Sequence, residues 1–191
     1  MTRTLRSVLI TTAVLVGIRA IAVAQQPASS HSSASDTAAP SLVSEALAGY
    51  NRTKKNIIGA AEAMPAEDFS FKPTPEIRSY AELFDHVAQV QTGLCGVISG
   101  AQPEHKPALN AATKDEVIAM VKQSFDNCDA AFAIVTDANA TEVSGKGFMR
   151  GSKVGNIQKD TAHNNEMYGQ MVVYMRLKGI VPPSTAMRGH K

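Results

Sequence analysis

Four stretches of the chain place apolar residues every three to four positions, and this helical periodicity is the strongest constraint on the fold. Each stretch is bounded by a polar capping residue or by a glycine or proline break. The pattern predicts helices over residues 41–63, 79–99, 113–135 and 152–178, with a short extended piece near 141–143. No alternating pattern of comparable length indicates a strand. Because four amphipathic helices must bury their apolar stripes against one another, we expect an all-α four-helix bundle.

The first 24 residues have the features of a secretory signal peptide. Arg3 and Arg6 give a positive start, an apolar run covers residues 8–18, and Ala22-Val23-Ala24 provides a small-x-small cleavage site. Arg19 interrupts the apolar run, which argues against a membrane span. No lipobox cysteine lies near the cleavage site, so we expect a secreted or periplasmic protein with no membrane anchor after cleavage.

The remaining chain divides into three parts. Residues 25–40 are rich in Ser, Ala and Pro and almost free of large apolar side chains, so they predict a flexible linker. Residues 41–184 hold the four helical stretches and form the expected domain, and residues 185–191 form a tail.

Charge excludes one class of partner. The full chain has 19 basic and 17 acidic residues, and three of the arginines lie in the leader, which leaves 16 basic against 17 acidic residues. The exported part therefore carries a formal charge of −1 and shows no basic patch interleaved with aromatic residues. Nucleic-acid binding is not expected.

Two segments carry a more specific pattern. The first runs from Met64-Pro65 to His86, and the second is the stretch 163–183, which begins with His163 and ends in R-L-K-G-I-V-P-P. In this order they resemble the first inter-helix loop with the second helix, and the last helix, of the DinB/YfiT-like family, in its secreted branch. The resemblance covers about residues 41–184. It implies an up-down-down-up bundle in which a long crossover joins a parallel second and third helix.

The same resemblance bears on the two cysteines. If the second and third helices are parallel, Cys95 and Cys128 lie at nearly the same height, 16 and 15 residues past the expected caps Ser79 and Thr113. Export would place them in an oxidising compartment. A Cys95–Cys128 disulfide is the hypothesis, and two buried free thiols are the alternative.

The resemblance also implies a metal site. In the family, a histidine of the second helix and an H-x-x-x-H pair of the last helix hold one divalent ion of the zinc, nickel or manganese class. His86 and His163 match two of these positions, but Met167 occupies the third. Its thioether is a soft ligand, poor for those metals and suitable for copper(I). Glu166, three residues after His163, is the alternative third ligand, although it lies about 100° around the helix from Met167.

Three interpretations of function stay open. In the first, the protein is a relative of metal-dependent thiol transferases, and its own activity is weak, altered or lost. In the second, it is a non-catalytic bundle that binds a small molecule or a partner. In the second case His86 and His163 are hydrogen-bonded remnants and Met167 fills the vacated volume. The third interpretation is a copper(I) or heavy-metal binder. The residues name no substrate and do not decide whether the protein is an enzyme. A homodimer is common among such bundles, but no motif specifies one.

Overall fold

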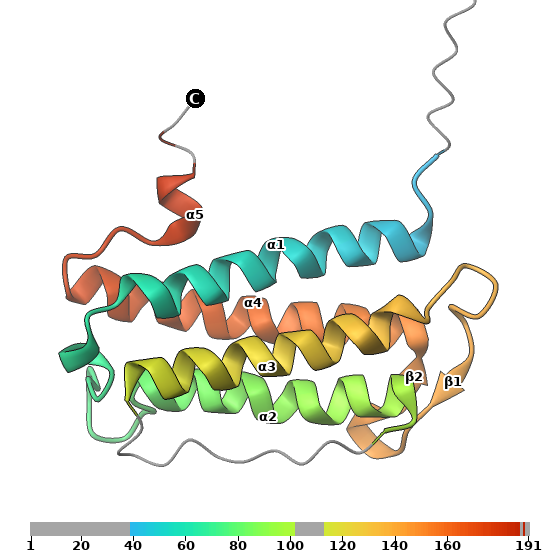
Figure 1. Ribbon diagram of the computed structural model, residues 1–191, viewed down its shortest axis with the longest axis horizontal. Helices are drawn as coiled ribbons and strands as arrows, with labels where there is room; N and C mark the ends of the chain where they lie inside the picture. The colour runs from blue at the N-terminus through green and yellow to red at the C-terminus, as the bar shows by residue number, and fades with distance from the viewer. Residues whose placement is uncertain (1–38, 102–112, 188, 190–191) are drawn as a thin grey trace, which may run out of the picture. The chain divides into compact units, whose positions relative to one another are not determined.

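Four long helices make up most of the described chain (Figure 1). The computed structural model describes residues 39–101, 113–187 and 189, so the expected leader and most of the expected linker lie outside it. The long helices are α1 (Leu42–Ala63), α2 (Tyr80–Ser99), α3 (Lys114–Ala133) and α4 (Lys153–Leu177). Their bounds lie within two residues of the predicted ones, which confirms the all-α bundle.

Local sequence determines where each helix begins. A polar side chain precedes each one and accepts a hydrogen bond from a backbone N–H of the first turn; these caps are Ser41, Ser79, Thr113 and Ser152. At Ser79 and Thr113 the side chain of a glutamate three residues later accepts a hydrogen bond from the cap backbone N–H, which completes a capping box at each of these expected caps.

Helices α2 and α3 run in the same direction. Gln91 of α2 accepts a hydrogen bond from Ser124 of α3, and one turn further on Cys95 is bonded to Cys128. Both pairs are 33 residues apart in sequence, so the contacts advance together along the two helices. The middle helices are therefore parallel, as the family resemblance implies.

Helices α1 and α4 form the other parallel pair. Gly49 of α1 lies against Thr161 of α4, and one turn later the Thr53 hydroxyl donates to Asn165 Oδ1 at 2.9 Å. In Figure 1, α1 and α4 lie side by side, as do α3 and α2.

Helix α4 runs opposite to α2. Tyr174, near the end of α4, donates a hydrogen bond to the carbonyl oxygen of Arg78 just before α2, at 2.6 Å. Asp160, nearer the start of α4, instead neighbours Gln91, farther along α2. The order of directions along the chain is therefore up-down-down-up.

Short elements complete the described chain. Strands β1 (Val143–Ser144) and β2 (Gly151–Ser152) pair antiparallel between α3 and α4, where a short extended piece is expected. Two single-turn 3-10 helices are η1 (Ala66–Asp68) and η2 (Gly147–Met149). The sequence does not predict α5 (Pro183–Ala186), which starts on a proline because the first helical position needs no N–H donor. Across the described residues, no helix combines the length and hydropathy that a membrane crossing requires.

The interior of the bundle has two chemically different regions. One is aromatic and contains edge-to-face contacts among Phe69, Tyr80 and Phe84. The other is polar and contains side chains that are 0 % exposed: Gln91, Asn156, Asp160 and Asn164. Because buried polar groups are costly unless they are hydrogen-bonded, the polar region marks the part of the core to search for a functional site.

Candidate functional site

The two candidate histidines lie together between α2 and α4. The ring centroids of His86 and His163 are 5.0 Å apart, and the ring planes are inclined at 68°. Both side chains are half-buried, because each lies at the edge of its helix's core-facing surface. The structure thus brings together two residues that are 77 positions apart in the chain.

Hydrogen bonding assigns different roles to the two nitrogens of the His163 ring. Asn164 Nδ2 donates to Asp160 Oδ2 at 3.0 Å, so the amide oxygen of Asn164 is the atom that faces His163 Nδ1, at 3.4 Å. An amide oxygen can only accept, so Nδ1 carries the hydrogen and Nε2 carries the lone pair. His163 Nε2 is buried and has no hydrogen-bond partner among the described residues. A histidine held through one nitrogen, with the other free, is typical of a metal ligand.

Both imidazoles are held in the neutral form. Burial lowers the pKa of His86, and the positive charge of Arg78 lowers it further. Burial is also the main cause of the lowered pKa of His163; the hydrogen bond to Asn164 opposes it, and the neighbouring His86 adds to it. The carboxylate of Glu166 acts in the opposite direction on both rings. Since only neutral imidazole coordinates a metal ion, the site favours the state that a ligand needs.

A third ligand is less well defined. Met167 lies one turn after His163 on the same face of α4 and is 3 % exposed within the apolar core. Glu166, the alternative, is exposed. Within the described ranges, no third His, Cys, Asp or Glu joins the two histidines in a set whose ligand atoms all lie within 4.8 Å of one another. The structure therefore brings two imidazoles together and leaves Glu166 outside the set.

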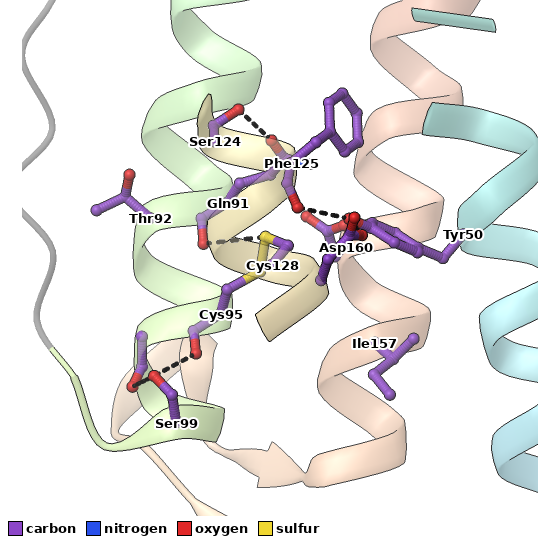
Figure 2. The surroundings of a disulfide bond; sticks show 12 residues. Tyr50, Gln91, Thr92, Cys95, Ser99, Ser124, Phe125, Cys128, Ile157 and Asp160 are labelled. Carbon is purple, nitrogen blue, oxygen red and sulfur yellow. Dashed lines mark hydrogen bonds between the residues drawn. A yellow bond between two sulfur atoms is a disulfide. The ribbon is translucent and has the colours of Figure 1, made fainter. Parts of the chain in front are cut away.

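The two cysteines form a disulfide that joins α2 to α3 (Figure 2). The Cα atoms of Cys95 and Cys128 are 5.1 Å apart, and the bond closes a loop with a sequence separation of 33. The structure thus contains the expected disulfide instead of the alternative pair of free thiols. In the chain-entropy model, a loop of this length contributes about 3–4 kcal/mol of stability.

Sequence reasoning missed a buried carboxyl group beside this disulfide. Asp160 is 0 % exposed, and its Oδ1 has no hydrogen-bond partner among the described residues. Burial raises the pKa of Asp160 to about 7. The Gln91 amide lowers it in part, although Gln91 Nε2 and Asp160 Oδ1 do not meet in a hydrogen bond of normal geometry.

Sequence signals for this polar region exist. The apolar stripe of the fourth predicted helix breaks between Asp160 and Glu166, and Asn164 lies four residues after Asp160 on the same helical face. Gln91 falls between the apolar Val87 and Leu94 at core-facing spacing. The sequence shows these polar residues on the buried faces of two helices but not that the two faces meet.

Comparison with known proteins identifies the family. A sequence profile described as the DinB superfamily matches residues 50–154. The chain belongs to the DinB superfamily. The match covers α2 with His86 and ends at the start of α4, before His163.

Two solved structures share the fold of this DinB-superfamily chain. A DinB-like protein from Bacillus cereus superposes with a TM-score of 0.59 at 15% identity, over 72% of this chain and 93% of that one. The DinB-like protein YjoA from Bacillus subtilis gives 0.55 at 18% identity, over 73% and 93%. No curated protein sequence gives a significant match. At these identities the likeness shows the fold alone.

Proposed function

We propose that this exported DinB-superfamily protein carries an altered metal site with His86 and His163 as its two nitrogen ligands. The observation that supports it is His163 Nε2, a buried lone pair with no partner among the described residues, next to a second neutral imidazole. An unsatisfied buried polar atom costs about 1–3 kcal/mol, and a bound ion would remove that cost.

The donor set makes this site weaker than a three-histidine one. Met167 takes the position of the family's third histidine, and its thioether is a poor ligand for zinc, nickel or manganese. When bound, a divalent ion would activate a water or a substrate thiol. With two strong ligands the protein holds such an ion loosely, so the transferase chemistry of the family is weakened, altered or lost.

Copper(I) is a second candidate ion. The buried Met167 lies on the same helical face as His163, one turn away, and a thioether with imidazoles suits this soft ion. The copper interpretation requires that Met167 binds the ion. The divalent interpretation does not.

Metal titration of the purified full-length chain tests the proposal. Zinc, nickel, manganese and copper(I) are titrated separately into wild type, His86→Ala, His163→Ala, Met167→Ala and Met167→His, with Glu166→Gln as the matched control at an exposed neighbouring side chain. We expect one ion per chain, loss of binding in both alanine variants, and zinc affinity raised at least ten-fold in Met167→His. Glu166→Gln should bind as the wild type does.

The outcomes separate the three interpretations. Binding that is unchanged in both alanine variants would overturn the site. Binding that appears only in Met167→His would identify the histidines as remnants and favour a non-catalytic bundle. Copper(I) binding that is lost in Met167→Ala, with zinc binding unchanged, would select the copper interpretation.

Export is part of the proposal and has its own test. The leader-like residues 1–24 and the disulfide of the folded domain are both typical of an exported protein. Intact mass of the protein recovered from outside the cytoplasm should correspond to a chain that begins at Gln25. A full-length chain confined to the cytoplasm would contradict export without affecting the metal site.

A further inference from the structure

We propose that the Cys95–Cys128 disulfide is a reducible redox centre, and that Asp160 supplies the proton needed by the sulfur that leaves. The proposal does not require a bound metal ion, because the disulfide and Asp160 lie at the opposite end of the polar region from the two histidines. The reductant is a small dithiol.

The geometry places an acid beside both sulfurs. The two Sγ atoms and a carboxylate oxygen of Asp160 all lie within 4.8 Å of one another. Asp160 approaches from α4, while the cysteines bridge α2 and α3 (Figure 2). One Asp160 oxygen is bonded to Asn164, and the other has no partner among the described residues. This free oxygen is therefore available to carry a transferable proton.

The surroundings also distinguish the two sulfurs. A pocket of about 230 Å³ opens between α2 and α3, and Cys95, Ser99, Asn127 and Ala131 are among the residues that line it. Cys128 does not line the pocket, is 0 % exposed, and its Sγ lies 3.8 Å from the carbonyl oxygen of Gln91. A disulfide sulfur has no hydrogen to donate, but a thiol at Cys128 would find this acceptor already in place.

These positions define the order of bond changes. A thiolate of the dithiol attacks Cys95 Sγ, the Cys95–Cys128 bond breaks, and Cys128 leaves as a thiolate that takes the proton of Asp160. The second thiol of the reagent then attacks the reagent sulfur of the mixed disulfide, and Cys95 is released. The dithiol is oxidised to a cyclic disulfide, the protein gains two thiols, and the two protons lost by the reagent balance those bound by the cysteines.

The other groups around Asp160 are a tyrosine, an ion pair, an amide and, farther away, a histidine. Tyr50 faces it from α1, and burial raises the pKa of that hydroxyl above its usual value. Beyond Tyr50, Asp129 of α3 accepts a hydrogen bond from the Tyr50 hydroxyl and forms an ion pair with Lys54 of α1. Gln91 from α2 is neutral, and His163, reached through Asn164, has a lowered pKa. Asp160, whose pKa is about 7, is thus the group in this described cluster that changes charge.

The test is the rate at which dithiothreitol reduces the oxidised full-length protein, measured by alkylation and mass spectrometry from pH 6.5 to 9. Rates are divided by the thiolate fraction of the reagent. We expect the corrected wild-type rate to fall at least ten-fold across this range as Asp160 loses its proton. In Asp160→Asn the rate should be at least ten-fold slower at pH 6.5 and independent of pH.

Asp129→Asn is the matched control, because Asp129 is a carboxyl residue that directly follows Cys128 in sequence but bonds to Tyr50. The corrected reduction rate of this variant should fall with increasing pH as the wild-type rate does. A purely structural effect of Asp160→Asn would shift the rate equally at every pH, so a variant with the wild-type pH profile would overturn the proposal. A reduction rate independent of dithiothreitol concentration would do the same, because the disulfide would then react only after unfolding.

Discussion

The two halves of α4 pack against the same bundle with opposite chemistry. Besides Ile157, the first half buries the polar side chains Asn156, Asp160, Thr161 and Asn164, whereas the second half buries Met167, Tyr168, Met171, Tyr174 and Met175. In the second half, the hydroxyl of Tyr168 bonds to Ser184 and that of Tyr174 bonds to Arg78. In the first half, side chains of Asn156, Asp160 and His163 have buried polar atoms that lack partners among the described residues.

This difference gives the two halves of α4 opposite contributions to stability. Burial of apolar side chains stabilises the second half, at roughly 1.5–3 kcal/mol for each large side chain. The first half contains groups that reduce stability unless something binds to them. The comparison predicts that substitutions in the two halves have opposite effects on the free energy of unfolding.

The largest expected effect is in the second half. Met171 is 0 % exposed, so Met171→Ala leaves a cavity and should lower the free energy of unfolding by about 2–5 kcal/mol. Urea denaturation measures this change. A loss below about 1 kcal/mol would mean that the second half is less tightly packed than the structure shows.

Asp160→Asn should have the opposite sign. Because the native pKa is raised from 3.8 to about 7, the folded protein retains a proton that the unfolded chain loses between these values. Wild-type stability contributed by this group is therefore present below pH 3.8 and is lost as the pH rises through 7. The variant should be more stable than wild type by a few kcal/mol at pH 8 and nearly equal at pH 4, by urea denaturation at both. A variant less stable than wild type at pH 8 would contradict the predicted difference between the two halves of α4.

A smaller loss is expected for Tyr168→Phe. The Tyr168 hydroxyl donates to Ser184 Oγ at 2.9 Å and accepts from Ser184 N at 3.0 Å, so it ties α4 to α5. Its removal should cost about 1 kcal/mol by thermal or urea unfolding. Hydrogen exchange should show faster exchange in residues 183–186, and unchanged protection there would contradict the role of this contact.

The smallest effect should be on the pH dependence of stability in His163→Gln. Since the folded pKa of His163 lies below its unfolded value of 6.5, the unfolded chain binds the proton first and stability falls as the pH drops below 6.5. Glutamine removes this contribution, so the variant should lose less stability than wild type between pH 7 and 5. Identical slopes would show that His163 is not held neutral by burial.

The periodic residues were sufficient to predict the helices and their caps, because helix propensity and capping depend on neighbours in sequence. The parallel course of α2 and α3 came from the family resemblance, and the Cys95–Cys128 contact depends on it. Asp160 could not be assigned from sequence, since its environment is made by Gln91 and Cys128 on two other helices. The same limit applies to the bond between Asn164 and Asp160, which fixes the tautomer of His163.

The amide of Asn164 has an accepting oxygen, which faces His163, and a donating nitrogen, which faces Asp160. If the amide rotates by half a turn so that its oxygen accepts a hydrogen bond from protonated Asp160, its nitrogen then faces His163 and Nδ1 must become the acceptor. The hydrogen of that ring moves to Nε2, and the lone pair available to a ligand disappears. Such a rotation of one side chain would couple the protonation of Asp160, beside the disulfide, to the tautomer of His163 without any movement of the backbone.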